Sequence, residues 1–261
     1  MKIATWNVNS LRVRLPHLQT WHATDQTEVI ALQETKTPDD EFPVEAIREA
    51  GLHVVFSGQR TYNGVAILSK TPAEDISMGI PGFADEQKRV LAATVNGVRI
   101  VNVYVPNGQT LDSDKYQYKL RWLEALTDYM RDELDRHHKL VLLGDFNIAP
   151  EDRDVHDPKA WEGSVLVSEP ERSALRKLLG LGLSDVFRRF EQPDKSFSWW
   201  DYRAAGFRRN AGLRIDLILC SQGMSEACTG CLINREPRRQ ERPSDHTPVI
   251  AEFAHAAMAL A

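Results

Sequence analysis

Two polar residues that could hold a metal ion follow an apolar run in KLVLLGDFNIAP, residues 139–150. The run at 141–143 predicts a short strand that is buried on both faces. Because side chains alternate along an extended backbone, Asp145 and Asn147 should project to one side while Phe146 packs on the other. A carboxylate beside a carboxamide suits a site that holds a hard cation and orients a polar substrate. A β-turn is the plainer alternative, since Gly, Asp and Asn all favour turns.

Other polar side chains also lie at or next to apolar, β-like runs. Glu34 follows the run at 29–32 and, taken alone, is better explained as a surface residue at a strand end. Several separate strands that deliver carboxylates, carboxamides, a phenol and an imidazole nevertheless indicate convergence on one rim. The chemistry that needs this mixture is metal-assisted phosphodiester hydrolysis. The residues concerned are Asn7, Glu34, Tyr104, Asp145, Asn147, Asp216, Asp245 and His246.

The acidic members of this set are oxygen ligands of the kind that Mg²⁺ or Mn²⁺ binds. Such ions keep several water ligands and bind few carboxylates, so Glu34 and Asp245 are the candidate metal ligands. His246 directly follows Asp245, and a second Asp from elsewhere would give an Asp–His pair. Such a pair fixes the tautomer of the imidazole and raises its basicity.

The hydrophobic pattern predicts an α/β chain that can position these residues. A hairpin is expected at 89–108, where two β-branched runs flank Asn96-Gly97, a strong type I′ turn signal. Residues 150–168 are expected to form a loop, and no linker or repeat divides the chain, so we expect one domain over residues 1–261. Further strands are expected at 1–9, 28–36, 53–58, 64–70, 139–147, 197–203, 212–220 and 249–253, and helices at 11–22, 43–50, 115–136 and 169–181.

Composition and charge limit the classes of function. The formal net charge of −5 argues against a basic nucleic-acid coat protein, although a local basic face is compatible with it. No apolar run reaches the length of a signal peptide or a membrane span, so we expect a cytoplasmic protein without membrane contact. We also expect a monomer. Cys228 and Cys231 lack an obvious fourth ligand, which favours reduced thiols over a zinc site. The apolar segment 254–261 predicts a helical tail or packing segment.

Motifs along the chain resemble the exodeoxyribonuclease III branch of the endonuclease/exonuclease/phosphatase superfamily. The motifs GDFN and SDH occur across the superfamily, including deoxyribonuclease I and inositol-phosphate phosphatases. LQETK, GLRID and WNVNSLR are specific to the DNA-repair branch. The resemblance implies a four-layer α/β sandwich of two packed mixed sheets flanked by helices, with a site at one edge. The matches run from residue 2 to about residue 254. The matching segments are WNVNSLR, LQETK, NGVAI, GDFNIAP, FSWWDYR, GLRIDLIL and RPSDHTPV.

The same resemblance implies how a metal ion would be held. Glu34 would be the principal ligand of Mg²⁺, with Mn²⁺ as the alternative. Asn7 and Asp245 would complete or support the metal shell. Asp145, Asn147 and His246 would border the same ion.

Catalytic roles follow from the resemblance as well. Asp145 would orient or deprotonate the attacking water, and Asn147 would hydrogen-bond the water or the transition-state oxygens. His246, paired with Asp216, would contact the scissile phosphate, and either His246 or Asp145 would be the base. Tyr104 would hydrogen-bond the phosphate or assist the leaving oxygen.

Members of the branch act on duplex DNA at abasic sites and at blocked or recessed 3′ ends. The resemblance places Trp199, Leu213 and Ile215 around a small apolar pocket for a flipped-out sugar, and ordinary core packing is the alternative for each. For each basic candidate, a solvated surface charge explains the residue equally well. The candidate phosphate contacts are Arg89, Lys115, Lys119, Arg203, Arg208, Arg209 and Arg214.

One departure from the family pattern concerns Leu166, where members often carry a small residue. A bulky side chain at the pocket rim would hinder the additional nucleotide that internal incision requires, while leaving removal of a 3′-terminal phosphate possible. The hypothesis is therefore a preference for 3′-end processing over abasic-site incision. Two alternatives belong to other classes: a phosphatase of small phosphorylated molecules or lipids, and a catalytically inactive relative that binds nucleic acid.

Overall fold

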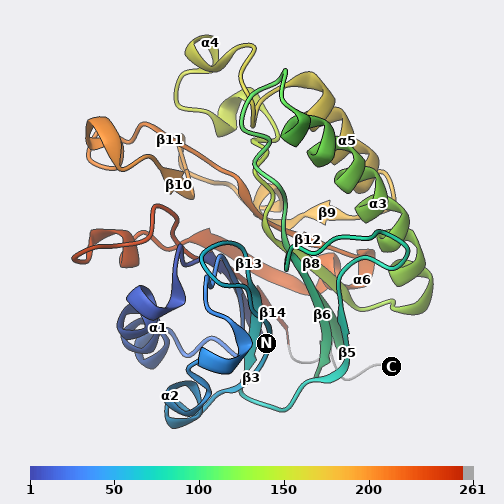
Figure 1. Cartoon of the computed structure of the whole chain (residues 1–261), viewed down its shortest axis with the longest axis vertical. Helices are drawn as coiled ribbons and strands as arrows, with labels where there is room; N and C mark the ends of the chain where they lie inside the picture. The colour runs from blue at the N-terminus through green and yellow to red at the C-terminus, as the bar shows by residue number, and fades with distance from the viewer. Residues whose placement is uncertain (255–261) are drawn as a thin grey trace.

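The computed structural model, which describes residues 1–254, contains two six-stranded mixed sheets (Figure 1). In the first sheet, the strand order is β13-β14-β1-β2-β4-β3. Only β1 and β2 run parallel, so their carboxyl ends meet at one edge. The strands are β1 (Lys2–Asn7), β2 (Val29–Gln33), β3 (His53–Ser57), β4 (Val65–Ser69), β13 (Cys228–Ile233) and β14 (Val249–Phe253).

The second sheet has the order β5-β6-β7-β8-β12-β9, and here β7 and β8 are the parallel pair. The predicted hairpin joins β6 to β7, with positive φ angles at Asn96 (50°) and Gly97 (75°) as a type I′ turn requires. A separate two-stranded ribbon, β10 with β11, extends from this half of the chain. The strands are β5 (Glu74–Met78), β6 (Val90–Val95), β7 (Val98–Tyr104), β8 (Leu140–Asp145), β9 (Ser184–Asp185), β10 (Trp199–Trp200), β11 (Gly212–Leu213) and β12 (Asp216–Cys220).

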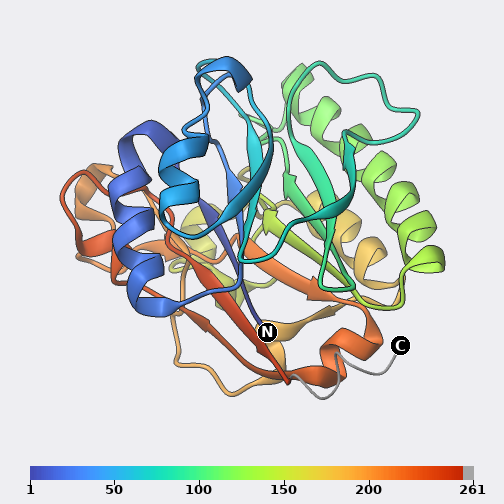
Figure 2. The same ribbon diagram turned by 90° about the horizontal axis from the view of Figure 1, so that it is seen from below.

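Helices cover the outer faces of both sheets, which gives four layers. Figure 2 shows α1 and α2 outside the first sheet and α3 and α5 outside the second. The predicted four-layer α/β sandwich is therefore confirmed. The helices are α1 (Leu11–Asp25), α2 (Val44–Glu49), α3 (Asp114–Arg136), α4 (Pro158–Trp161), α5 (Glu169–Leu179) and α6 (Gln222–Ala227). Single 3₁₀ turns lie at Asp39–Glu41, Asp152–Asp154, Val186–Arg189, Arg203–Ala205 and Pro237–Arg239.

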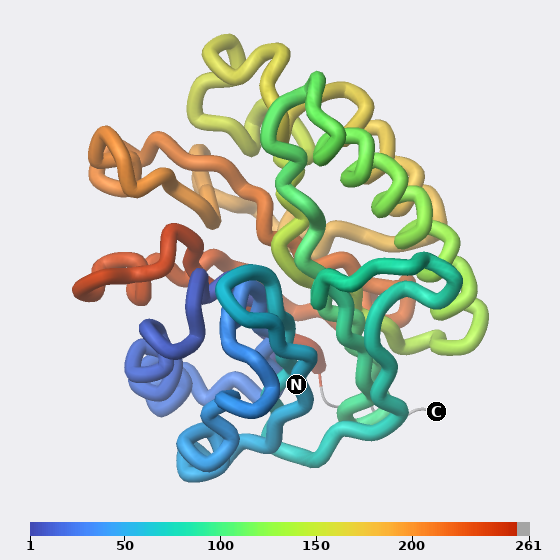
Figure 3. Tube along the Cα trace, in the orientation of Figure 1, coloured from blue at the N-terminus to red at the C-terminus, as the bar shows by residue number. Residues whose placement is uncertain are grey.

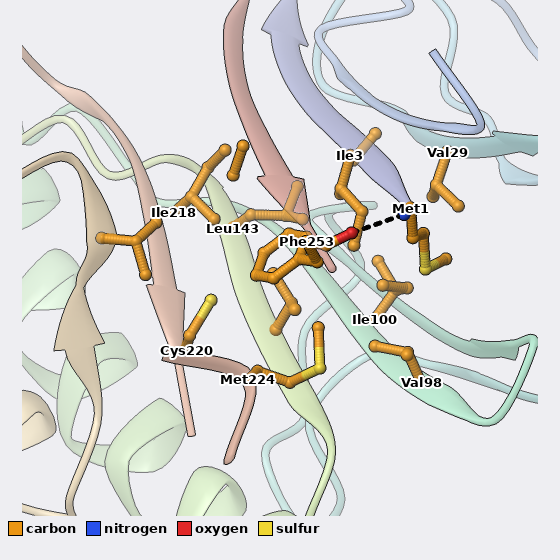
Figure 4. Close-up of a cluster of buried hydrophobic side chains, with 14 of the residues drawn as sticks. Met1, Ile3, Val29, Val98, Ile100, Leu143, Ile218, Cys220, Met224 and Phe253 are labelled. Carbon is orange, nitrogen blue, oxygen red and sulfur yellow. Dashed lines mark hydrogen bonds between the residues drawn. The ribbon is translucent and has the colours of Figure 1, made fainter. Parts of the chain in front are cut away.

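The inner core lies between the two sheets. Figure 4 shows side chains from both, including Ile3, Ile100 and Leu143, packed together with Met224 and Phe253. All are at most 3% exposed, and burial of this apolar surface is the main force that holds the sheets face to face. The amino group of the first residue also donates to the carbonyl of Phe253 at 2.7 Å, which ties the start of β1 to β14.

A buried polar contact between Asn102 and Gln33 fixes the two sheets relative to each other beside the end of β2. Asn102 in β7 donates its amide to the carbonyls of Leu32 and Ala66 in the first sheet, both at 2.9 Å. Its carboxamide oxygen accepts a hydrogen bond from Gln33 at 2.8 Å. Both side chains are fully buried, and because Gln33 immediately precedes Glu34, this contact sets the depth at which Glu34 leaves the sheet.

Several sequence predictions differ from the structure in detail. The strand expected at 197–203 contains only two paired residues, and the one expected at 212–220 is divided between β11 and β12. The loop expected at 150–168 contains the short α4. Residues 255–261, most of the predicted C-terminal tail, lie outside the described part. Within residues 1–254, no helix is both long and apolar enough to cross a membrane.

Candidate active site

Strands of both sheets end at the same edge of the sandwich and deliver polar side chains there. In the second sheet, Asp145 lies in register between Tyr104 on β7 and Asp216 on β12. Since β12 is antiparallel to β8, its first residue lies beside the last residue of β8. In the first sheet, Asn7 ends β1, and Glu34 directly follows β2. The predicted convergence of strand ends is thus present in the structure.

Asp145 lies at the centre of this cluster and is 1% exposed. Its Oδ2 accepts a hydrogen bond from Asn7 at 2.9 Å, and its Oδ1 accepts one from the backbone amide of Asn147 at 2.9 Å. Asn147 has φ 49°, so a turn rather than continued strand alternation brings its side chain back to the same side. The segment therefore forms the turn given as the alternative, and this turn places the Asn147 side chain beside Asp145.

Asn147 is also held in place by hydrogen bonds of its own side chain. Its amide donates to the carbonyl of Val105 at 3.0 Å, and its side-chain oxygen accepts from Asn107 at 3.2 Å. Phe146 packs on the opposite face, fully buried in the core under α3 and α5, as predicted. These contacts fix the orientation of the carboxamide before any substrate binds.

His246 pairs with Asp216 within hydrogen-bond distance. Its Nδ1 lies 2.9 Å from one carboxylate oxygen of Asp216 and 3.1 Å from the other. Its Nε2 faces Asp145, 3.6 Å from Oδ2. Both members of the pair are at most 4% exposed, so the imidazole has a fixed orientation and presents only Nε2 to the edge.

Glu34 is the more accessible carboxylate of the cluster, with its side chain 18% exposed. It accepts a hydrogen bond from Asn7 at 2.8 Å and forms an ion pair with Lys36 at 2.9 Å. Glu34 and Lys36 have φ angles of 50° and 51°, and Asn9 opposite them has 43°. Non-glycine residues rarely adopt such angles, and their grouping is typical of functional sites.

Asp245 belongs to the same edge but is held by a different set of donors. Its carboxylate accepts from Asn9 at 2.9 Å and from the indole of Trp199 at 3.0 Å. Burial raises the pKa of Asp245, but His246 and these two hydrogen bonds outweigh burial and lower it. Asp245 therefore carries a negative charge, and hydrogen bonds connect it to Glu34 through Asn9, by way of Lys36 and of Asn7.

The electrostatics of the cluster reflect its burial. Burial raises the pKa of the Asp145 carboxyl to about 7, although the nearby His246 opposes this rise. Burial alone would lower the pKa of His246, but the carboxylates of Asp216 and Asp145 outweigh it and raise that pKa to about 10. Burial, reinforced by Glu34 and Asp145, raises the pKa of Tyr104 well above its usual value, so its phenol keeps its proton.

The donor set fits a divalent cation. Among the described residues, one group of acidic, His or Cys side chains has ligand atoms near enough to share an ion, namely Glu34, Asp145 and His246, within 4.8 Å of one another. Carboxylate and carboxamide oxygens, the latter from Asn7, are ligands that Mg²⁺ and Mn²⁺ accept. A cation here would also relieve the mutual repulsion of the carboxylates.

Residues 4–246 match the endonuclease/exonuclease/phosphatase family. Exodeoxyribonuclease III from Haemophilus influenzae is 36% identical over 266 residues, which cover 97% of this chain and 100% of that protein. The chain belongs to the exodeoxyribonuclease III branch of this family. The resemblance inferred from the motifs is thereby confirmed.

Solved structures of the family agree with the fold throughout its length. The 3′ phosphatase NExo from Neisseria, bound to a product DNA hairpin, has a TM-score of 0.96 and 50% identity, covering 97% of this chain and 99% of that one. An AP endonuclease from Archaeoglobus fulgidus has a TM-score of 0.94 and 40% identity, with the same coverage. This exodeoxyribonuclease III-type chain is thus similar both to a 3′ phosphatase and to an AP endonuclease.

The residues expected around a sugar pocket do lie together. Leu213, Ile215 and Leu166 form one apolar cluster, and Trp199 packs against it. The three aliphatic side chains are at most 4% exposed, while Trp199 is half-buried. Trp199 is also bonded to Asp245, so the apolar cluster adjoins the polar edge.

Two predicted phosphate contacts are wrong. Arg214 is 1% exposed, and its guanidinium binds Asp154 at 2.6 Å and Asp185 at 2.8 Å. Side-chain alternation along the backbone does point Arg214 away from Leu213 and Ile215. The loop that carries Asp154, however, covers the side to which Arg214 points. Lys119 is fully buried and forms an ion pair with Glu171. Neither cation can reach a DNA backbone without breaking a buried ion pair.

The other basic candidates differ in exposure. Lys115, Arg203, Arg208 and Arg209 are exposed. The last three belong to the loop between β10 and β11, which projects on the same side of the molecule as the segment before β14 (Figure 3). Arg89 is 9% exposed and lies under Tyr104, with its guanidinium carbon 4.6 Å from the ring centroid.

Sequence reasoning missed an amide-rich cavity beside the catalytic cluster. It has a volume of about 590 Å³ and is bordered by Glu34 and Tyr104 on one side. Gln59, Asn63 and Gln87 supply its polar wall. Gln59 and Asn63 share the loop between β3 and β4, and Gln87 lies in the loop between β5 and β6. Asn63 begins the NGVAI segment, but no strand end or motif singles out Gln59 or Gln87.

Proposed function

We propose that this protein is a metal-dependent DNA-repair phosphodiesterase of the exodeoxyribonuclease III type. Its substrates would be duplex DNA with abasic sites, 3′-phosphates, 3′-blocking groups or 3′-terminal nucleotides. One observation carries this proposal above the rest. The Glu34–Asp145–His246 group and the Asp216–His246 pair are assembled at the edge of a fold shared with a DNA-bound 3′ phosphatase and an AP endonuclease.

These substrates call for a single chemical step. A water oxygen forms a bond to phosphorus, the bond between phosphorus and a 3′ oxygen breaks, and that oxygen takes up a proton. We assign the orientation and deprotonation of the water to Asp145, because its carboxylate faces both His246 and the Glu34 side of the edge. Asn147 would hydrogen-bond the attacking oxygen or the phosphoryl oxygens.

Two further groups would stabilise the phosphate as its charge changes. His246 presents only Nε2, because Asp216 occupies Nδ1, and can donate from there to a phosphoryl oxygen. Tyr104 keeps its proton and can donate it in a hydrogen bond to the phosphate or the leaving 3′ oxygen. Both donors are fixed before substrate arrives, which lowers the reorganisation needed in the transition state.

Mg²⁺, or alternatively Mn²⁺, would be held by Glu34, with Asp145, Asn7 and Asp245 completing or supporting its shell. When bound, such an ion supplies Lewis-acid polarisation of the phosphate and neutralises developing charge.

A preference for 3′-end processing is the narrower candidate, and Leu166 favours it. Incision at an internal abasic site must place the sugar beyond the scissile phosphate in the apolar cluster, whereas a terminal 3′-phosphate has no such sugar. Leu166 fills part of that cluster together with Leu213 and Ile215. The 50% identity to a 3′ phosphatase, against 40% to an AP endonuclease, supports the same direction.

The test uses purified protein with Mg²⁺, and then with EDTA, on two labelled duplexes. One carries an internal abasic site and the other a nick with a 3′-phosphate. Metal-dependent action on both would support a general repair enzyme, and action on the 3′-phosphate alone would support the specialised one. Activity on inositol phosphates instead of DNA would favour a small-molecule phosphatase, and binding without cleavage would favour an inactive relative.

We further propose that the protein works as a monomer in the cytoplasm, with residues 1–261 forming one catalytic domain. The absence of disulfides among its three cysteines is compatible with a reducing compartment. Gel filtration with light scattering would test the oligomeric state.

A further inference from the structure

A fully buried ion pair lies behind the catalytic edge, between α3 and α5. Lys119 and Glu171 are both 0% exposed at their side chains, and the ammonium donates to the carboxylate. Removing two charges from water is costly, and their attraction compensates only if their remaining hydrogen-bonding capacity is also satisfied. Nearly all the hydrogen-bonding capacity of Lys119 and Glu171 is used, and the groups that they bind lie in loops beside the candidate active site.

The ammonium of Lys119 holds two loops that follow neighbouring strands. It donates to the backbone carbonyl of Asn147 at 2.7 Å and to that of Asn107 at 3.1 Å. Those two residues are also bonded to each other through their side chains. With the bond to Glu171, all three ammonium protons have acceptors.

The carboxylate of Glu171 holds the loop that leads into α5. One oxygen accepts from the backbone amide of Leu166 at 3.0 Å, and the other accepts from the backbone amide of Ser168 at 3.1 Å and from its hydroxyl. The contact with the Ser168 amide is one half of the capping box of α5, and in the other half the Ser168 hydroxyl accepts from the backbone amide of Glu171. The Leu166 contact lies outside that capping box, and it fixes a leucine that has φ 76°.

The pair therefore connects the loop of Asn147, which carries reaction chemistry, to the loop of Leu166, which forms the apolar cluster. We propose that Lys119 and Glu171 are positioning residues that set these two loops relative to each other, and thereby set turnover and the choice between abasic-site and 3′-end substrates. This inference rests on the proposed function.

The two members act on different loops, which separates their effects. Lys119 contacts the backbone of Asn147, which serves every substrate. Lys119→Met keeps a long apolar side chain but leaves the carbonyls of Asn147 and Asn107 without their donor. We expect turnover to fall about 100-fold on both duplexes, as a displacement near 1 Å would cause, with DNA affinity unchanged.

Glu171 contacts the backbone of Leu166, which matters only when a sugar occupies the apolar cluster. Lys119 and the Leu166 amide share one oxygen of Glu171, and Ser168 uses the other. Glu171→Gln has a single acceptor oxygen, so it cannot accept from both Leu166 and Ser168, and the loop at 166–168 loses one of its two anchors. We expect the ratio of abasic-site incision to 3′-phosphate removal to change about tenfold. A small change in the shape of a binding pocket alters substrate discrimination by about this factor.

A matched control separates positioning from stability. Glu133 lies near the other end of α3, is 1% exposed and pairs with Arg99 at 2.6 Å, away from the catalytic edge. Glu133→Gln should lower the melting temperature without changing turnover or the substrate ratio.

The double variant Lys119→Met/Glu171→Gln addresses the charge left buried in the single Lys119 variant. It should recover melting temperature relative to Lys119→Met, because no unpaired charge remains, yet keep the low turnover. Recovery of turnover along with stability would overturn the proposal, as would turnover of Lys119→Met within threefold of the unaltered enzyme. If the unaltered enzyme cleaves neither duplex with Mg²⁺, the proposed function itself fails, which is a distinct result.

Discussion

The imidazole of His246 and the carboxylate of Asp216 meet at 2.9 Å, although 30 residues separate them in the chain. Asp216 begins β12 in the second sheet, and His246 precedes β14 in the first. The contact therefore forms only when the two sheets pack together. It occupies Nδ1 and leaves Nε2 facing Asp145, so folding and the correct presentation of the imidazole are linked.

Replacing Asp216 by Asn tests this relationship. A carboxamide can donate to Nδ1, which would place the imidazole proton on Nε2 in the neutral ring and remove the charge that favours the imidazolium. We expect turnover to fall by about 10³-fold while the melting temperature changes little. Single-turnover cleavage of the 3′-phosphate duplex measures the effect, with the exposed-loop change Asp201→Asn as control. A loss smaller than threefold would contradict the role given to the pair.

Asp145→Asn tests the assignment of the carboxylate that faces the water. An amide cannot accept a proton from water, so we expect turnover to fall by about 10³-fold, within the usual range for losing a general base. DNA affinity should be retained, because the change removes a negative charge near the phosphate. Rapid-quench assays and fluorescence anisotropy measure the two quantities. Near-normal turnover in this variant would reject the assignment.

Glu34→Gln tests where the metal ion is held. The amide oxygen of the new side chain can still accept from Asn7, so the local geometry should survive, but the negative charge is lost. We expect the Mg²⁺ concentration for half-maximal activity to rise about 10- to 100-fold. Titration with Mg²⁺ after EDTA treatment measures this, and Glu45→Gln, at an exposed side chain, is the control. An unchanged requirement for Mg²⁺ would move the principal ligand elsewhere.

The strand ends could be predicted because they obey local rules. Apolar runs such as those before Glu34 and Asp145 specify buried strands, and the polar residue after each run must leave the core. Parallel pairing brings Asn7 and Glu34 to one end of the first sheet, and Tyr104 and Asp145 to one end of the second. The meeting of these two ends, like the pairing of Asp216 with His246, depends on how the sheets pack together, which spacing alone cannot establish.

The buried ion pairs of Arg214 and Lys119 could not be predicted, because they depend on how distant loops pack. Arg214 and Lys119 read as surface cations because their partners, Asp154, Asp185 and Glu171, lie in distant segments. Nothing in the local pattern around these residues marks them as ion-pair partners. The strand β13 was missed for a related reason, since its Cys-Thr-Gly-Cys sequence lacks the alternation of a typical strand and is paired only through β14.

Gly144, immediately before Asp145, offers a test of backbone geometry. Its φ is 148°, and a Cβ there would lie 1.9 Å from the carbonyl oxygen of Val103 on β7. We expect Gly144→Ala to lower the free energy of unfolding by about 1–3 kcal/mol and to reduce activity, because β8 must shift away from β7. Gly230→Ala in β13, where a Cβ meets nothing within 4 Å, is the control. Equal thermal stability of both variants would show that the strands can adjust without strain.

Leu166 is the residue that we propose decides between the broader and narrower functions. Its φ of 76° suits glycine better than leucine, and its side chain packs with Leu213 and Ile215. Leu166→Gly removes a wall of the apolar cluster and relieves backbone strain, which offsets part of the cost of lost burial. We expect abasic-site incision to rise about tenfold relative to 3′-phosphate removal.

Initial rates on the two duplexes measure this ratio. Leu175→Ala, which removes an equally buried leucine from the core beneath α5, should lower stability without changing the ratio. The preference itself requires the unaltered enzyme to process the 3′-phosphate faster, because comparable rates would mean that Leu166 excludes nothing. The unaltered enzyme could act more slowly on abasic DNA while Leu166→Gly leaves the ratio unchanged. That result would assign the restriction on abasic-site incision to Trp199 or to the loop between β10 and β11 instead.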